Sequence, residues 1–257
     1  MSSNRLTILI PTFNESRNIR AAIECSRFAD EILVVDSFST DDTLSIAQQM
    51  GARVLQHEYI NSATQKNWAI PQSACEWVMI LDADERIPAS LQTEIRDFVN
   101  NPRSDAAMRI RRASFFMGQP IKYCGWQDDS VLRVFPRERG RYVDREVHAD
   151  AVVDGPERLA AHKLDHYTFD SFEQYMKKFD RYTTWAAGDR ARKTKHVGAV
   201  HLLGRPIWRF FKQYILRLGI FDGRAGIVVC MLAAFSVFLK YAKLWERQQK
   251  DDAAGKK

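Results

Sequence analysis

The chain has 257 residues, of which 46% are hydrophobic, and its net charge is +6. This length allows one substantial core with a helical appendage, and the composition excludes a low-complexity or repeat protein. The four cysteines lack closely spaced Cys or His neighbours, which disfavours a zinc site and favours free thiols in a reducing compartment. The apolar run at 6–11 is too short for a signal peptide. We therefore expect a cytoplasmic protein.

The positive charge is concentrated in the last third of the chain. Residues 177–257 contain 18 Lys and Arg but only 6 Asp and Glu, whereas residues 1–176 contain 20 and 26. Such asymmetry indicates an anionic partner for the C-terminal segment. A membrane surface and a nucleic acid both satisfy this requirement.

The first half alternates short apolar runs with helical patterns. Strands are predicted at 6–10, 32–35, 53–55 and 77–81, and the helices between them end near residues 28, 50 and 70. This order, with strands that are apolar throughout, predicts an α/β fold with a parallel sheet covered by helices on both faces. Ligands of such sheets bind beyond the carboxyl ends of the strands.

The second half is less regular and then becomes helical. Two more strands are predicted at 107–111 and 131–135, and the pattern is mainly helical from Ser171 onward. We therefore expect an α/β domain at 1–170, followed by a basic, amphipathic helical region at 171–250.

The helical region has the composition of a membrane-contacting segment. Residues 206–221 mix aromatic and basic side chains, and residues 225–239 form a run of fifteen without a charge. A membrane-spanning helix needs about 20 apolar residues. We therefore predict an interfacial or re-entrant helix pair that contacts anionic headgroups without spanning the membrane. The alternative is a buried helix at a dimer or domain interface.

Two carboxylates follow the apolar strand at 77–81. Asp82 and Asp84 are two residues apart, and at the rim of a sheet their charges require a compensating cation. Mg²⁺ and Mn²⁺ prefer carboxylate oxygens and commonly bridge to phosphates. The pair therefore predicts a metal–diphosphate site, although an Asp-x-Asp in a solvated turn would look the same.

A third carboxylate, Asp36, ends the strand at 32–35. It can contact a nucleobase or ribose hydroxyl, or it can cap the following helix. Pro11 and Thr12 end the first strand at the same predicted rim. The chain contains neither the Gly-x-Gly-x-x-Gly pattern nor a P-loop, which disfavours a dinucleotide-binding fold and a P-loop enzyme.

Several motifs together resemble the family 2 glycosyltransferases with the GT-A fold. The matching segments are 8–15 (ILIPTFNE), 32–37 (ILVVDS), 81–85 (LDADE), 125–129 (GWQDD), 132–135 (LRVF), 147–148 (VH), 205–206 (RP), 221–223 (FDG) and 240–245 (KYAKLW). They cover nearly the whole chain. The branch that the sequence most resembles is the bacterial enzymes of the lipopolysaccharide inner core, often described as β-1,4-glucosyltransferases.

This resemblance implies roles for donor-side residues. Asp36 would contact uracil, and Pro11, Thr12 and Glu15 would line the nucleoside pocket. Gln65 and Lys66 match a pair expected near the nucleotide. Asp82 and Asp84 would flank the metal, Mg²⁺ or Mn²⁺, and the diphosphate, with Asp84 as the direct ligand.

The resemblance also implies an inverting reaction with a carboxylate base. Asp129 matches the family's base, and Asp128 stands where relatives often carry Pro, so it is the alternative. Relatives commonly read Val-His-Glu where this chain has Val147, His148 and Ala149, so Glu146 or Asp150 are further alternatives.

Two other residues have open roles at this point. His148 would complete the metal shell or bind a phosphate, or it is structural. Arg133 would pair with Asp129 or with a pyrophosphate oxygen, or form a structural salt bridge.

The expected function is sugar transfer from UDP-glucose to a lipid-linked saccharide, such as the lipopolysaccharide core, at the cytoplasmic face of the inner membrane. The same fold also suits a polyprenyl phosphate acceptor. A nucleic-acid-binding module is disfavoured because nucleic acid would leave the uncharged run at 225–239 without a partner. We expect no nucleic-acid partner, and a homo-oligomer is left open.

Overall fold

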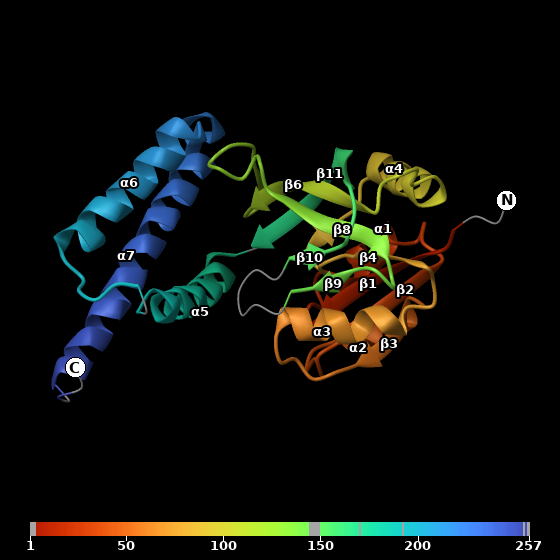
Figure 1. Ribbon diagram of the computed structural model, residues 1–257, viewed down its shortest axis with the longest axis horizontal. Helices are drawn as coiled ribbons and strands as arrows, with labels where there is room; N and C mark the ends of the chain where they lie inside the picture. The colour runs from red at the N-terminus through yellow and green to blue at the C-terminus, as the bar shows by residue number, and fades with distance from the viewer. Residues whose placement is uncertain (1–3, 144–149, 170, 192, 254, 256–257) are drawn as a thin grey trace. The chain divides into compact units, whose positions relative to one another are not determined.

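The computed structural model describes residues 4–143, 150–169, 171–191, 193–253 and 255 (Figure 1). The chain divides into two compact units. Met1–Ala113 and Asp129–His166 form the first, which we call the sheet unit. Ser114–Asp128 and Tyr167–Lys257 form the second, which we call the helical unit.

A mixed sheet dominates the described part of the chain. Its strands are β1 (Leu6–Thr12), β2 (Glu31–Asp36), β3 (Arg53–Gln56), β4 (Trp77–Ile80), β5 (Glu85–Arg86), β6 (Ala107–Phe116), β7 (Gln119–Ile121), β8 (Ser130–Pro136) and β11 (Glu157–Phe169). The strand order is β3-β2-β1-β4-β8-β6-β11-β5, with β7 paired to β6. A separate two-stranded sheet joins β9 (Arg141–Tyr142) to β10 (Ala151–Val152).

The sheet changes from parallel to antiparallel at β8. β1 is parallel to β2 and β4, and β2 is parallel to β3. β8 is antiparallel to β4, with Met79 opposite Val134. Because the two strands run in opposite directions, the beginning of β8 lies at the same edge as the carboxyl end of β4. The residue that precedes β8 is Asp129.

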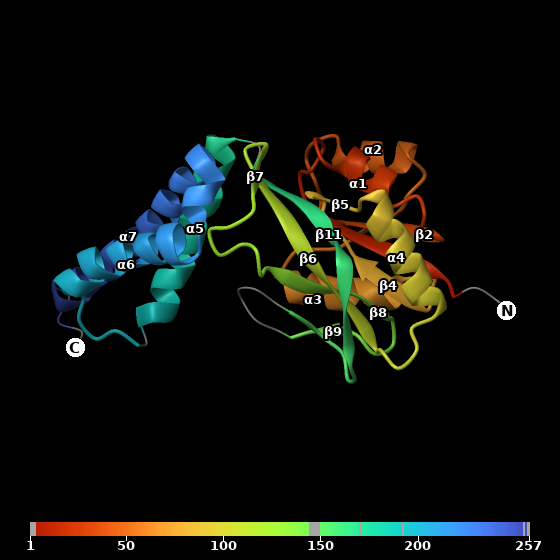
Figure 2. The ribbon, with the colours of Figure 1, turned by 90° about the horizontal axis from the view of Figure 1, so that it is seen from above.

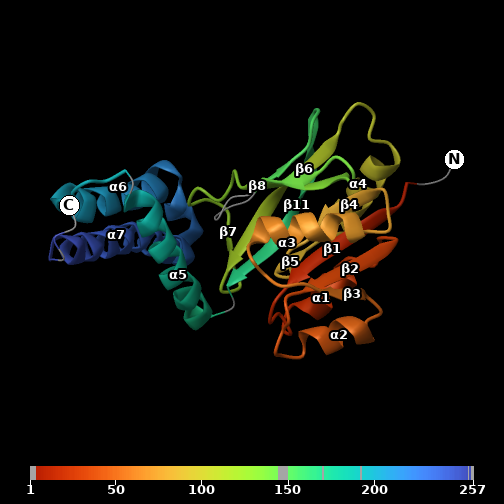
Figure 3. The same ribbon diagram turned by 60° about the horizontal axis from the view of Figure 1, so that its bottom comes forward.

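Helices cover both faces of the parallel part, because its strands are apolar on both sides (Figures 2 and 3). These helices are α1 (Ile19–Cys25), α2 (Thr43–Gln49), α3 (Ser62–Ala69), the single turn η1 (Ile70–Gln72) and α4 (Ala89–Asn100). Residues of α1, α2 and α4 share one buried cluster, and α3 contributes to another.

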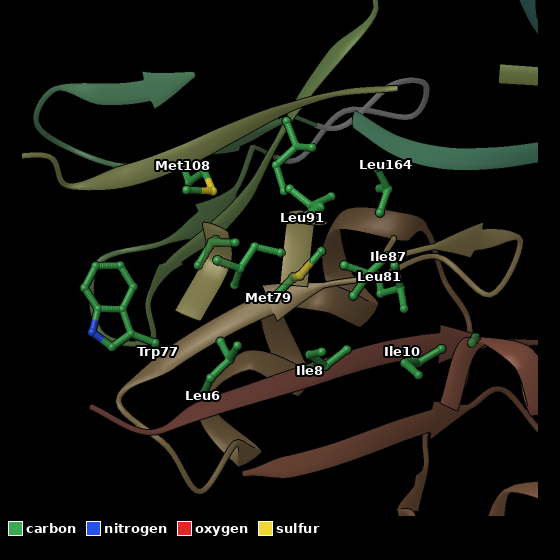
Figure 4. Close-up of a cluster of buried hydrophobic side chains, with 14 of the residues drawn as sticks. Leu6, Ile8, Ile10, Trp77, Met79, Leu81, Ile87, Leu91, Met108 and Leu164 are labelled. Carbon is green, nitrogen blue, oxygen red and sulfur yellow. The ribbon is translucent and has the colours of Figure 1, made fainter. Parts of the chain in front are cut away.

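The first cluster is built by alternation along the strands (Figure 4). Leu6, Ile8 and Ile10 of β1 are fully buried on this side, and Leu9 of the same strand belongs to the second cluster. Alternate strand residues face opposite sides of a sheet, so a strand that is mainly apolar and buried supplies both cores. The packing fixes where each strand ends, and therefore where the rim lies.

The helical unit contains α5 (Phe172–Ala191), the short turns η2 (Val200–Gly204), η3 (Lys212–Leu216) and η4 (Gly219–Asp222), α6 (Arg205–Phe211) and α7 (Gly223–Ala253). Within it, α6 lies beside α7 (Figures 1 and 3). Phe116, Ile121 and Cys124 pack with Val229 and Cys230 of α7. The end of β6 from Ser114 onward, β7 and the segment up to Asp128 therefore belong to this unit.

The predicted α/β class with a C-terminal helical extension is confirmed. The parallel ladders join the four strands from the first 80 residues. β8 is antiparallel to both β4 and β6, and β7 is antiparallel to β6. The segment Gly219–Ala253 is long and apolar enough, by length and composition alone, to cross a membrane. The length argument against spanning therefore does not hold, and contact without spanning stays a prediction.

Candidate functional site

The carboxyl ends of β1, β2 and β4 form one rim of the sheet unit. Thr12 lies opposite Asp36 in the β1–β2 ladder, and the Leu81 amide donates to the carbonyl of Leu9. Backbone pairing therefore brings the ends of these strands side by side. The sequence prediction placed its donor-side residues at this rim.

Asp36 is fully buried, and its carboxylate closes a local turn. Oδ2 accepts hydrogen bonds from the Ser39 amide at 3.0 Å and from Nε2 of Gln56 at 3.1 Å, and Oδ1 accepts one from Oγ of Ser39 at 2.5 Å. The structure therefore gives Asp36 a turn-capping role. Contact with a nucleobase stays a prediction.

The other predicted nucleoside residues surround this turn. Thr12 is buried, and its Oγ1 has no hydrogen-bond partner among the described residues, whereas Pro11 is half-buried. The Glu15 amide donates to Oγ1 of Thr43 at 2.8 Å. Nε2 of Gln65 donates to Oγ of Ser37 at 2.5 Å. The loops after β1 and β2 and the helix α3 therefore converge here.

A chain of ion pairs begins at Lys66 and crosses the rim. Nζ of Lys66 lies 3.2 Å from Oδ1 of Asp82, and Nη2 of Arg133 lies 2.7 Å from Oδ2 of the same carboxylate. The same Nη2 lies 2.5 Å from Oε1 of Glu85, which is fully buried. Arg133 is thus shared by two carboxylates. Of the roles left open for it, the structure shows salt bridges, and they reach Asp82 and Glu85 instead of Asp129.

Asp129 is instead bound by Arg112 of β6. Nε and Nη2 of Arg112 lie 2.9 and 2.7 Å from Oδ2 of Asp129, and the Arg112 amide donates to the Asp129 carbonyl. Nη1 of Arg112 lies 3.7 Å from Oε1 of Glu85. The ion-pair chain therefore begins at Lys66 and Asp82 and ends at Asp129. Arg133, Glu85 and Arg112 connect the two ends.

Burial and neighbouring charges have opposite effects on the pKa values of the residues in the ion-pair chain. Burial by itself would raise the pKa of Asp82, but Arg133 and Lys66 hold it well below its ordinary value. Burial by itself would lower the pKa of Lys66, but Asp82 outweighs it and the pKa is raised. Burial raises the pKa of Glu85, despite the opposing charge of Arg133. Asp82 and Lys66 thus remain charged across the neutral pH range.

Asp84 lies outside the ion-pair chain. Its Oδ2 is 3.7 Å from Nε2 of His166, a residue of β11, and the side chain is 20% exposed. Nδ1 of His166 is buried without a hydrogen-bond partner among the described residues. Asp84 can therefore offer carboxylate oxygen to a cation, whereas both oxygens of Asp82 already face Lys66 and Arg133.

No group of three or more His, Cys, Asp or Glu side chains that could hold a metal is found within the described residues. His148 and Glu146 lie outside those residues, so their predicted roles are not addressed. Asp150 is exposed. Asp128 belongs to the helical unit, where Oδ2 lies 2.8 Å from Nη1 of Arg217.

Sequence reasoning missed Glu85 and Arg112 as members of the site. Glu85 follows Asp82 and Asp84 directly in the segment 81–85, and its full burial was not visible in the sequence. Arg112 lies in a strand with Arg109 and Arg111. A strand with arginines on both of its faces signals that one of them is paired inside, but the sequence does not identify its partner.

The model of glycosyl transferase family 2 matches residues 7–150. This chain belongs to glycosyl transferase family 2. The match contains β1, β2, β4 and β8, and therefore the rim with Asp36, Asp82 and Asp129. The predicted α/β fold of the GT-A type agrees with this membership.

Two curated relatives of this family 2 glycosyltransferase match almost end to end. An uncharacterized glycosyltransferase of Rickettsia felis is 30% identical over 94% of this chain and 90% of its own length. The lipopolysaccharide core biosynthesis glycosyltransferase LpsC of Rhizobium meliloti is 26% identical over 94% of this chain and 92% of its own. Both matches include the helical unit.

A solved structure is similar to part of the chain. Glucosyl-3-phosphoglycerate synthase of Mycobacterium tuberculosis, in complex with Mn²⁺, UDP and glucosyl-3-phosphoglycerate, matches 52% of this chain and 57% of its own. The TM-score is 0.41 and the identity is 19%.

Proposed function

We propose that this family 2 glycosyltransferase transfers glucose, with inversion, from UDP-glucose to a lipid-linked saccharide such as the lipopolysaccharide core. The observation that carries the proposal is the ion-pair chain that links Asp82, on the donor side, to Asp129, on the acceptor side, at one rim. The end-to-end similarity to LpsC supports the acceptor class.

On the donor side, the proposal assigns the nucleoside to the loops after β1 and β2. Thr12 Oγ1 is a buried hydroxyl with no described partner, and buried polar groups normally have one. Lys66 and Arg133 are buried cations at the same rim. Asp82 and Glu85 already pair with these cations, so Lys66 and Arg133 hold the rim together, and a divalent cation would neutralise the departing diphosphate.

On the acceptor side, the proposal assigns the base to Asp129. Both contacts from Arg112 reach Oδ2, and none of the described residues bonds Oδ1. The acceptor hydroxyl loses its proton to this carboxylate as its oxygen attacks the anomeric carbon. The bond from that carbon to the diphosphate oxygen breaks, and its electron pair leaves with UDP. Attack opposite the leaving group converts an α-linked donor into a β-linked product.

A divalent cation, Mg²⁺ or Mn²⁺, fits this site through Asp84. The carboxylate is partly exposed and lies outside the ion-pair chain, and such ions prefer carboxylate oxygen. When bound, the ion neutralises charge on the departing diphosphate. Asp82 balances Lys66 and Arg133, so we assign it to the electrostatics of the site.

The proposed location is the cytoplasmic face of the inner membrane. The helical unit exposes an apolar stripe along η2, α6 and η3. It contains Val200, Leu203, Ile207, Phe211 and Ile215, which are three or four residues apart, and Trp208 beside Ile207. Arg209 and Lys212 are exposed on the same segment. An amphipathic, basic and aromatic helix is typical of the membrane interface, where a lipid-linked acceptor resides.

A screen of donors and acceptors tests the function. The full chain is incubated with UDP-, GDP- and CDP-sugars, with and without Mg²⁺ or Mn²⁺, and with core-truncated lipopolysaccharide or polyprenyl phosphate. We expect metal-stimulated transfer from UDP-glucose to the lipopolysaccharide. Transfer only to polyprenyl phosphate would replace the acceptor class, and no transfer from any nucleotide sugar would overturn the proposal.

A further inference from the structure

The helical unit contains a strained turn immediately before Asp129. Cys124 has a φ of +58° and Gly125 a φ of +83°. Glycine adopts this region freely, but a residue with a side chain does so at a cost of about 1–3 kcal/mol and persists only where its surroundings hold it. Something must therefore hold Cys124.

The segment from η3 to η4 forms hydrogen bonds to the backbone of this turn. Nε2 of Gln213 donates to the Cys124 carbonyl at 2.9 Å, and the Cys124 amide donates to the Arg217 carbonyl at 3.2 Å. The carboxylate of Asp222 accepts the amides of Lys122 at 3.0 Å and Tyr123 at 2.9 Å. Four successive hydrogen bonds thus fix the path of residues 122–124.

The anchoring segment is itself rigidly packed. A Cβ at Gly226, in the first turn of α7, would lie 2.0 Å from the Gly219 carbonyl oxygen, so only glycine fits there. Gln213 is buried, as are Cys124 and Cys230 beside it. The turn therefore rests on the packed part of the helical unit.

Beyond this anchor, the turn presents groups suited to a saccharide. Trp126 is half-buried, and Gln127 accepts the Gly125 amide through Oε1 at 2.9 Å. Asp128 is 72% exposed and pairs with Arg217, which is 46% exposed. An aromatic ring with planar polar groups offers an apolar face together with directed hydrogen bonds, which is what a sugar ring and its hydroxyls require.

We propose that residues 123–128, which we call the acceptor turn, bind the acceptor saccharide, and that Gln213 and Asp222 are positioning residues for it. The proposal rests on the function proposed above, because it assigns an acceptor to a family 2 enzyme. In the sequence, the turn is followed directly by Asp129.

The test compares two identical substitutions in the helical unit. Gln213→Met removes the amide that holds the acceptor turn. Gln248→Met is the matched control, because Gln248 also bonds backbone groups, those of Thr194, Lys195 and Val197, but in another segment. Binding of UDP-glucose is measured by calorimetry, and initial rates are measured with core-truncated lipopolysaccharide.

We expect Gln213→Met to raise the KM for the acceptor about tenfold and to leave the affinity for UDP-glucose unchanged. The reason is that a misplaced acceptor turn weakens binding of the acceptor and not of the donor. Gln248→Met should change neither value. Equal acceptor KM values in the two variants would overturn the proposal. A wild-type chain that binds no nucleotide sugar would instead overturn the proposed function, and this inference with it.

A second variant keeps the test informative if Gln213→Met unfolds. Arg217→Gln removes an exposed ion pair, and such pairs contribute little to stability, so the melting temperature should stay unchanged. The acceptor KM should still rise, because Asp128 loses its partner in the acceptor turn. An unchanged acceptor KM in Arg217→Gln would contradict the role of this turn.

Discussion

At the residue scale, Asp129 depends on one arginine for its orientation. Both contacts of Arg112 reach the same carboxylate oxygen, Oδ2, at 2.7 and 2.9 Å, and in the proposed reaction Oδ1 would take the proton of the acceptor hydroxyl. Arg109, three residues earlier in β6, pairs with Glu157 away from the ion-pair chain. The two arginines therefore provide a matched pair for mutation.

Arg112→Gln should lower kcat for transfer about tenfold to a hundredfold, because small displacements of a reacting group cost that much. Binding of UDP-glucose should be retained. Steady-state kinetics and calorimetry measure the two effects, with Arg109→Gln as the control. Equal kcat values in both variants would remove the positioning role of Arg112.

Asp84 supports a separate prediction about the metal. Asp84→Asn should weaken Mn²⁺ binding in the presence of UDP about tenfold or more, because the site loses a charged ligand. Calorimetry with the metal measures this directly. Asp97→Asn, at an exposed position on α4, should bind Mn²⁺ like the wild type. Unchanged affinity in Asp84→Asn would move the metal site elsewhere.

The sequence predicted some of the site residues at this scale and missed others. Asp36 and Asp82 follow apolar strands, and the family motif marked Asp129 directly. Arg112 was missed because its partner, Asp129, lies 17 residues away, immediately before another strand. Glu85 escaped because burial of a carboxylate depends on Arg133, which comes from β8. Pairings of this kind require the register of the antiparallel strands.

At the element scale, Glu31 ties three parts of the parallel sheet together. Its carboxylate accepts hydrogen bonds from Oγ1 of Thr7 in β1, from the Ala74 amide before β4 and from Arg53 of β3. Burial alone would raise the pKa of Glu31, but these hydrogen bonds and Arg53 lower it. A lowered pKa means that folding favours the ionised form.

Glu31→Gln should lower the free energy of unfolding by about 1–2 kcal/mol at pH 7, because charged hydrogen bonds are lost. The wild-type advantage is fully present above the ordinary pKa of 4.5 and disappears as the pH falls through the lower folded value. Urea unfolding of both proteins between pH 3 and pH 7 measures the difference. A constant difference across that range would contradict the assignment.

The elements that were predicted and those that were missed differ in their apolar pattern. β1 is buried at nearly every position, so its apolar run was unmistakable. β11 has thirteen residues of which only Ala160 and Leu164 are buried, so its charged sequence gave no period-two signal. β6 and β11 are neighbours in the sheet. Because the sequence of β11 lacks an alternating apolar pattern, the strand order of this part of the sheet could not be inferred from the sequence.

At the scale of the whole molecule, the helical unit accounts for the charge asymmetry of the chain. Its exposed apolar stripe along η2, α6 and η3 includes Trp208 and Phe211, and only 28% of the most apolar window of Gly219–Ala253 is buried. The inclusion of Ser114–Asp128 in this unit was not visible in the sequence, because it depends on packing against α7.

Membrane contact through this stripe can be measured by sedimentation with phosphatidylglycerol vesicles. We expect the full chain to bind, and the double variant Trp208→Ser/Phe211→Ser to bind about tenfold more weakly, because it loses buried apolar area. Leu159→Ser changes an exposed apolar residue of the sheet unit and should bind normally. Equal binding by all three proteins would argue against an interfacial stripe.

The role of Asp129 as the base is tested most directly by measuring sugar transfer and UDP-glucose binding with the same Asp129→Asn protein. If Asp129 is the base, transfer should fall about a hundredfold to ten-thousandfold, while the affinity for UDP-glucose stays at the wild-type value. The wild-type product should carry a β-linkage. Transfer at the wild-type rate by Asp129→Asn, or an α-linked product, would contradict the account.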